Sequence, residues 1–152
     1  MAARAEGLTV EREVLIEASP EAVWQFLVDP AKVIRWMGVT AELEPRPGGK
    51  YRVQVQRGHF ASGTITLVEP PSRLVLTFGW EHHSAGGLPP GSTTVEFELV
   101  PVSEGTLLRF SHRRLPDEAA AASHGSGWEH YLGRLQQLAG GVDPGQDPWL
   151  DS

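Results

Sequence analysis

The chain of 152 residues contains no cysteine. This absence excludes disulfide bonds, thiolate metal ligands and a cysteine nucleophile. The sequence also lacks any run of about 18 apolar residues, the length that a membrane-spanning helix needs. The short polar stretch at residues 1–7 lacks the apolar core of a signal peptide. We therefore expect a cytoplasmic protein without a membrane span.

Positive charge is scarce. The chain has 13 Lys and Arg residues against 19 Asp and Glu residues, a formal net charge of −6. Proteins that bind nucleic acid in general need a basic face that displaces counterions. The only basic cluster is at residues 112–114, so no nucleic-acid partner is predicted.

Several catalytic and cofactor motifs are missing as well. The sequence has no GxSxG nucleophile elbow, no GxGxxG between a strand and a helix, and no HExxH. The adjacent His82 and His83 would point to opposite sides of an extended chain, which does not suit a shared metal ion. The sequence therefore predicts neither a metal site nor a cofactor.

The sequence contains stretches in which apolar and polar residues alternate. This pattern is typical of strands with one buried face and one solvent-exposed face. Short turns such as the Gly- and Pro-rich residues 45–49 separate successive strands, which favours an antiparallel meander. The expected strands are residues 8–17, 40–44, 51–56, 59–68, 73–80, 93–100 and 106–112.

Helices are expected at two places. Ser19 and Pro20 suit the N-cap and the first position of a short helix, and Asp29-Pro30 ends it and starts a second. After residue 115 apolar residues recur at spacings of three and four as far as Leu138. We predict an α+β, helix-grip fold: a curved antiparallel sheet of about six or seven strands wrapped around a long C-terminal helix, with two short helices after the first strand.

The predicted organisation is a single domain at residues 8–140 between a flexible N-terminus (1–7) and a flexible tail (141–152). Trp149 is unusual in such a tail; it could cover an edge or a neighbouring subunit, but the composition favours flexibility. An exposed edge strand would also allow a homodimer.

Several segments resemble the SRPBCC (START-like) superfamily, and within it the branch named after the activator of heat-shock-protein-ninety ATPase. The resemblance covers residues 8–138, nearly the whole chain, and depends on the order of short motifs. They are residues 18–24, Trp36, 47–49, 63–78, 105–112, Gly127-Trp128, Tyr131-Leu132 and Leu135.

The resemblance implies an apolar cavity under the C-terminal helix. Members of the superfamily include lipid and hormone binders, aromatase/cyclases and co-chaperone domains. Large aromatic residues expected on the inner face suit such a cavity, although ordinary core is the commoner role for each of them. Trp36, Trp80 and Trp128 lie at the ends of elements, near the expected mouth. The candidate ligand-binding residues are Trp36, Tyr51, Phe78, Trp80, Phe97, Phe110, His112, His124, Trp128 and Tyr131.

Two glycines interrupt the long helical pattern. Gly125 and Gly127 should each cost about 1 kcal/mol relative to alanine. Either close packing on the sheet or room for a ligand would explain them, and the sequence does not decide between the two.

Three functions remain open from the sequence. The first is binding of a small hydrophobic or aromatic ligand without catalysis, and no catalytic residue is assigned. The second is a cyclase or dehydratase in which His112, His124 or Tyr131 moves a proton. The third is a co-chaperone or other protein-interaction domain that uses the outer face of the sheet or the loop at 81–91.

Overall fold

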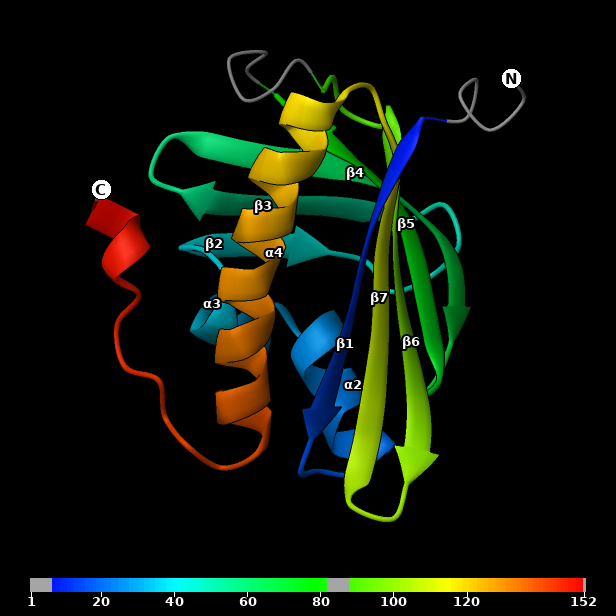
Figure 1. Ribbon diagram of the computed structural model, residues 1–152, viewed down its shortest axis with the longest axis vertical. Coiled ribbons are helices and arrows are strands. Elements are labelled where there is room, and N and C mark those ends of the chain that lie inside the picture. The colour runs from blue at the N-terminus through cyan, green and yellow to red at the C-terminus, as the bar shows by residue number, and fades with distance from the viewer. Residues whose placement is uncertain (1–6, 82–87, 152) are drawn as a thin grey trace.

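The computed structural model describes residues 7–81 and 88–151. These residues form one antiparallel sheet of seven strands in the order β1-β7-β6-β5-β4-β3-β2, and a long helix, α4, that crosses its concave face (Figure 1). The strands are β1 (Leu8–Ile16), β2 (Thr40–Leu43), β3 (Lys50–Gln56), β4 (His59–Glu69), β5 (Arg73–Trp80), β6 (Thr93–Val102) and β7 (Gly105–Leu115). The predicted helix-grip architecture is confirmed.

Each helix begins directly after a residue whose side chain caps it. The Ser19 hydroxyl accepts a hydrogen bond from the Ala22 amide (3.2 Å) at the start of α2 (Pro20–Val28). Asp29 ends α2 and caps α3 (Pro30–Trp36), and Asp117 caps α4 (Glu118–Ala139). Each cap satisfies an amide that the helix itself leaves without a partner.

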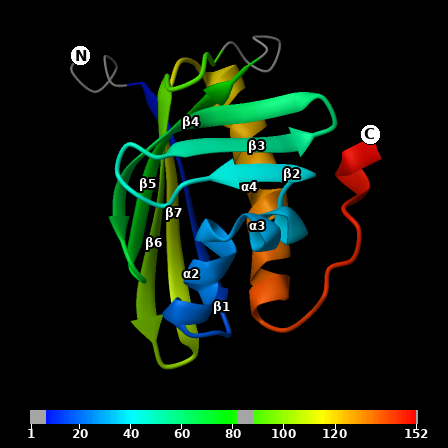
Figure 2. The same cartoon turned by 180° about the vertical axis from the view of Figure 1, so that it is seen from behind.

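The sheet curves enough that its two ends differ in direction. Strands β1, β7 and β6 run along one side of α4, whereas β2, β3 and β4 pass across it (Figures 1 and 2). Helices α2 and α3 lie at one end, where α3 contacts both β2 and α4. Buried apolar side chains therefore lie between α4, the concave face and these two helices, as the alternation predicted.

Several sequence expectations concern residues outside the described range. His82, His83 and most of the loop at 81–91 are among them, as are residues 1–6. The C-terminal segment, for which we expected a flexible tail, makes contacts with the rest of the chain. Residues 142–151 turn back along α4 and end in a 3-10 helix, η1 (Pro148–Asp151), that contacts β3 (Figure 1).

Substitution of Leu135 tests how much of the free energy of unfolding depends on the contact between α4 and the sheet. Its side chain is fully buried, so Leu135→Ala should lower the free energy of unfolding by about 2–5 kcal/mol through lost burial and a cavity. Gln137→Ala, at an exposed position two residues on, is the matched control and should change it by less than about 0.5 kcal/mol. Urea denaturation measures both, and equal effects would contradict the packing described here.

Candidate functional site

A cavity of about 340 Å³ lies between α4 and the strands that cross it. Its volume is at the lower end of the roughly 300–1,000 Å³ that ligand sites occupy. The lining residues come from five separate strands, helices or connecting segments and from the C-terminal segment. They are Met37, Val55, Gln56, His59, Phe78, Trp80, Ser123, His124, Gly127, Trp128, Tyr131 and Trp149.

Aromatic rings form the deep wall. Trp128, on α4, packs against Phe78 of β5 with ring centroids 5.8 Å apart. On its far side Trp128 contacts Phe110 (4.5 Å) and Phe97 (6.3 Å). Tilted and edge-to-face contacts of this kind are favourable and directional. The wall of the cavity is therefore held in place by a second layer of rings behind it.

A buried histidine anchors Trp128. The Trp128 indole N–H donates to Nδ1 of His112 (3.0 Å), and an indole nitrogen can only donate. Nδ1 must therefore be unprotonated, so the neutral ring carries its proton on Nε2. That nitrogen lies 2.7 Å from the Thr93 hydroxyl, which in turn donates to the Phe78 carbonyl (2.6 Å). The chain of bonds fixes one tautomer of His112.

His124 has an equivalent arrangement at the edge of the cavity. The Trp80 indole donates to its Nε2 (3.0 Å), which leaves the proton on Nδ1. Nδ1 donates to the carbonyl of Ala120, one turn earlier on α4 (2.8 Å). Both ring nitrogens of His124 therefore have protein partners, and neither is free to accept from a ligand.

Both histidines are held neutral. Burial, together with the ring of His124 5.3 Å away, lowers the pKa of His112 from 6.5 to about 3. Burial also lowers the pKa of His124, although its bond to the Ala120 carbonyl opposes this. Protonation would in addition place an N–H of each imidazole against an indole N–H. The site therefore contains two fixed neutral imidazoles.

Tyr131 supplies a hydroxyl group to the lining of the cavity. Its hydroxyl has no hydrogen-bond partner among the described residues, although its ring contacts His130 and Trp149. Burial, and to a smaller extent the Asp147 carboxylate, raises the pKa of Tyr131 to about 12. The hydroxyl is thus protonated at neutral pH and able to donate to a ligand.

The two glycines of α4 have different surroundings. A Cβ on Gly125 would lie 3.1 Å from Nη2 of Arg12 and 3.8 Å from the Val10 side chain. Gly125 therefore allows α4 to pack closely on β1. A Cβ on Gly127 would meet nothing within 4 Å, and Gly127 lines the cavity. Packing explains the first glycine and open space surrounds the second.

The structure brings five of the ten predicted site residues to the cavity: Phe78, Trp80, His124, Trp128 and Tyr131. Phe97, Phe110 and His112 lie behind Trp128 instead. Trp36 is buried at the end of α3, where its indole donates to the Phe26 carbonyl (2.8 Å), and Tyr51 packs in the core.

Seven lining residues were not among the predicted ligand contacts: Met37, Val55, Gln56, His59, Ser123, Gly127 and Trp149. Val55 lies on the apolar side of β3, so the alternation could have identified it. Trp149 is 93 residues from Gln56, whose amide donates to the Trp149 carbonyl (3.1 Å). No short-range pattern predicts a contact of that separation.

Within residues 7–81 and 88–151, no group of three His, Cys, Asp or Glu residues could hold a metal ion. Nor is any helix in that part of the chain long and apolar enough to cross a membrane. The outer face of the sheet carries ion pairs between neighbouring strands. Glu96 accepts from Arg73 (2.6 Å) and Arg113 (2.7 Å), and Arg109 pairs with Glu13 (3.1 Å).

The neutral histidine predicts a pH dependence of stability. Between pH 6.5 and about 3 the unfolded chain binds a proton at His112 that the folded protein excludes. This contribution to stability is complete above pH 6.5 and is lost as the pH falls, by about 1.4 kcal/mol per pH unit. Between about pH 7 and pH 4.5 the wild-type protein should lose about 3 kcal/mol more of its free energy of unfolding than the His112→Gln variant loses. The exposed His59→Gln is the control; equal slopes in all three proteins would contradict the assignment.

Comparisons with known proteins agree with the fold. The family model described as "Activator of Hsp90 ATPase homolog 1-like protein" matches residues 17–140. An AHSA1-like protein from Rhizobium etli is 45% identical over 93% of this chain and 88% of its own, with a TM-score of 0.75. A protein from Mesorhizobium loti is 27% identical over 86% and 96% of the two chains, with a TM-score of 0.76.

A third similar structure is CalU16 from Micromonospora echinospora. It is 30% identical over 91% of this chain and 68% of its own, with a TM-score of 0.71. No match was found among curated protein sequences. The family match over most of the chain and the similarity to the Rhizobium protein agree with the helix-grip architecture. The chain belongs to the Activator of Hsp90 ATPase homolog 1-like family.

Proposed function

We propose that the protein binds a small, flat and largely apolar molecule in the cavity beneath α4. The observation that carries this proposal is Gly127, a helical glycine that faces a cavity of about 340 Å³ with nothing within 4 Å of its missing Cβ. Glycine costs a helix interior about 1 kcal/mol relative to alanine. No packing requirement accounts for that cost here, whereas space for a ligand does.

The chemistry of the lining narrows the ligand class. None of the lining residues in the described part of the chain is Asp, Glu, Lys or Arg, and burial lowers the pKa of the lining His124. A charged ligand would lose its hydration without gaining an ion pair. The rings of Phe78, Trp80 and Trp128 offer flat apolar contacts, and Tyr131 offers one donor. These features favour a neutral aromatic ligand with a hydrogen-bond acceptor.

The enzymatic alternative has weaker support. A cyclase or dehydratase needs a group that moves a proton within reach of the ligand. His112 lies behind the wall, and both nitrogens of His124 are already bonded. Tyr131 remains, but its pKa of about 12 makes it a poor proton donor to a substrate at neutral pH. Because both histidines accept from tryptophan indoles, these contacts support binding more than catalysis.

The protein-interaction alternative is not favoured by the described outer surface. The outer face of the sheet carries the ion pairs of Glu96 and Glu13 rather than an apolar patch. The exposed large apolar side chains there and elsewhere are few: Leu8, Leu15, Ile34 and Val142. Single exposed apolar residues are ordinary on soluble proteins.

The direct test is native mass spectrometry of the protein purified from its own host, with identification of anything that remains bound. Acridine, a flat tricyclic molecule with one ring nitrogen as acceptor, serves as the defined probe in mildly alkaline buffer, where it is uncharged. We expect saturable binding with a stoichiometry of one. An empty protein that also fails to bind acridine would refute the proposal.

The glycines of α4 provide a matched pair of variants. Gly127→Leu should fill the cavity and weaken acridine binding at least tenfold, while raising the free energy of unfolding by about 0.5–1 kcal/mol through helix propensity. Gly133, also on α4 and with nothing within 4 Å of its Cβ, does not line the cavity. Gly133→Leu should give the same stabilisation and leave binding within about twofold. Titration calorimetry and urea denaturation measure the two effects; unchanged acridine affinity in Gly127→Leu would place the ligand elsewhere.

A further inference from the structure

The C-terminal segment forms part of the cavity wall. We name residues 142–151 the C-terminal strap. It leaves the end of α4 at Gly140, runs back along that helix and reaches the tips of the strands that cross it (Figure 1). The strap adds nothing to the sheet, and α4 is complete before it begins. Its contacts therefore need a reason other than completion of the fold.

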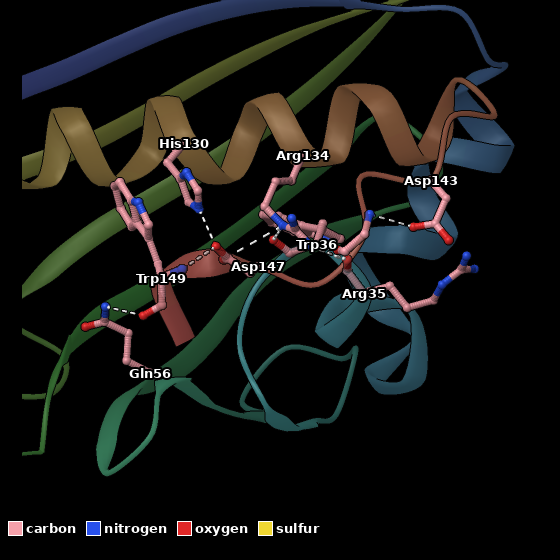
Figure 3. A network of polar contacts seen from close by, with 9 residues as sticks. Arg35, Trp36, Gln56, His130, Arg134, Asp143, Asp147 and Trp149 are labelled. Carbon is pink, nitrogen blue, oxygen red and sulfur yellow. Dashed lines mark hydrogen bonds and ion pairs between the residues drawn. The ribbon is translucent and has the colours of Figure 1, made fainter. Parts of the chain in front are cut away.

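A buried carboxylate holds the strap against α4. Asp147 is only 4% exposed. Its Oδ1 lies 2.8 Å from Nε2 of His130 and accepts from the Trp149 amide (2.9 Å), which starts the final 3-10 helix. Arg134, one turn further along α4, donates to the Gly145 carbonyl (2.8 Å) and places its Nε 3.8 Å from Asp147 Oδ2 (Figure 3).

The position of Asp147 in the strap opposes folding. Oδ2 of Asp147 is buried and has no hydrogen bond, and burial of an incompletely paired carboxylate opposes folding. Without the strap's contacts to α4 and β3, Asp147 could remain in solvent and avoid that cost. The position that Asp147 fixes is that of Trp149, two residues later.

Trp149 bridges the two sides of the cavity mouth. Its indole stacks on the imidazole of His130, with centroids 3.6 Å apart and planes at 4°. Its carbonyl accepts from the Gln56 amide of β3 (Figure 3). Trp149, Gln56, His59 and Ser123 line the cavity but are less buried than Phe78 and Trp128, so they form its rim. The strap thus adds an aromatic ring to the rim, not to the deep wall.

We propose that Trp149 is a specificity-determining residue that extends the site for ligands of about three fused rings. This inference rests on the proposed function. A smaller ring system fits against Phe78 and Trp128 without reaching the rim, whereas a longer one also contacts the indole that the strap supplies. Asp147 is the positioning residue, because it holds the strap without lining the cavity.

The test compares two neutral probes that share one acceptor nitrogen, quinoline with two fused rings and acridine with three. Dissociation constants are measured by titration calorimetry on the full-length protein. Trp149→Ala should weaken acridine about tenfold and quinoline less than about twofold, since one aromatic contact is lost for the longer probe alone. Asp147→Ala should change the ratio in the same direction. Leu150→Ala, in the same 3-10 helix but not in the cavity wall, should leave both constants unchanged.

The outcomes separate this inference from the one on which it depends. Equal loss of both probes in Trp149→Ala, or no change in either, would overturn the role of Trp149 while ligand binding stands. A change of ratio in Leu150→Ala as large as in Trp149→Ala would also overturn it. Failure of the wild-type protein to bind either probe would refute the proposed function, and this inference with it.

Discussion

The hydrogen bond from the Trp128 indole to His112 is the interaction on which the cavity depends. It joins α4 to β7, next to the edge strand β1, at a depth where both side chains are buried. Because the indole can only donate, the imidazole must be neutral, and because the imidazole is neutral it can be buried without a counter-charge. Thr93 and the Phe78 carbonyl complete the chain, so the ring that forms the deep wall is oriented by bonds rather than by packing alone.

A second bond of the same kind lies at the edge of the cavity. Trp80 and His124 form a second indole-to-imidazole bond, again with one fixed tautomer. Two tryptophans of the cavity are thus held by two histidines, each of which is bonded at both nitrogens. What resembles a pair of catalytic residues in the sequence is, in the structure, a scaffold for aromatic surfaces. Under the proposed function, a ligand would contact these rings and the Tyr131 hydroxyl.

Much of the fold was predictable because it depends on short-range patterns. Alternation identified the strands, and Ser19, Pro20 and Asp29 marked the helix boundaries to within a residue or two. Half of the candidate site was not predictable in the same way. The alternation predicts that Phe97, Phe110 and His112 face inward. It does not predict that Trp128 lies between them and the cavity. The contribution of Trp149 depends on a contact across 93 residues, and on Asp147, whose burial no local pattern indicates.

Gly127 also has a consequence for how this site can diverge. Most positions around a buried cavity are coupled, because a larger side chain must displace neighbours that support the fold. At Gly127 nothing lies within 4 Å of the missing Cβ, so alanine, serine or valine could appear there by single nucleotide changes without repacking the core. Each would shorten the cavity by a different amount and would favour the helix. Under the proposed function, selection on ligand shape could therefore act at Gly127 alone, while the sheet, α4 and both indole–imidazole bonds stay unchanged.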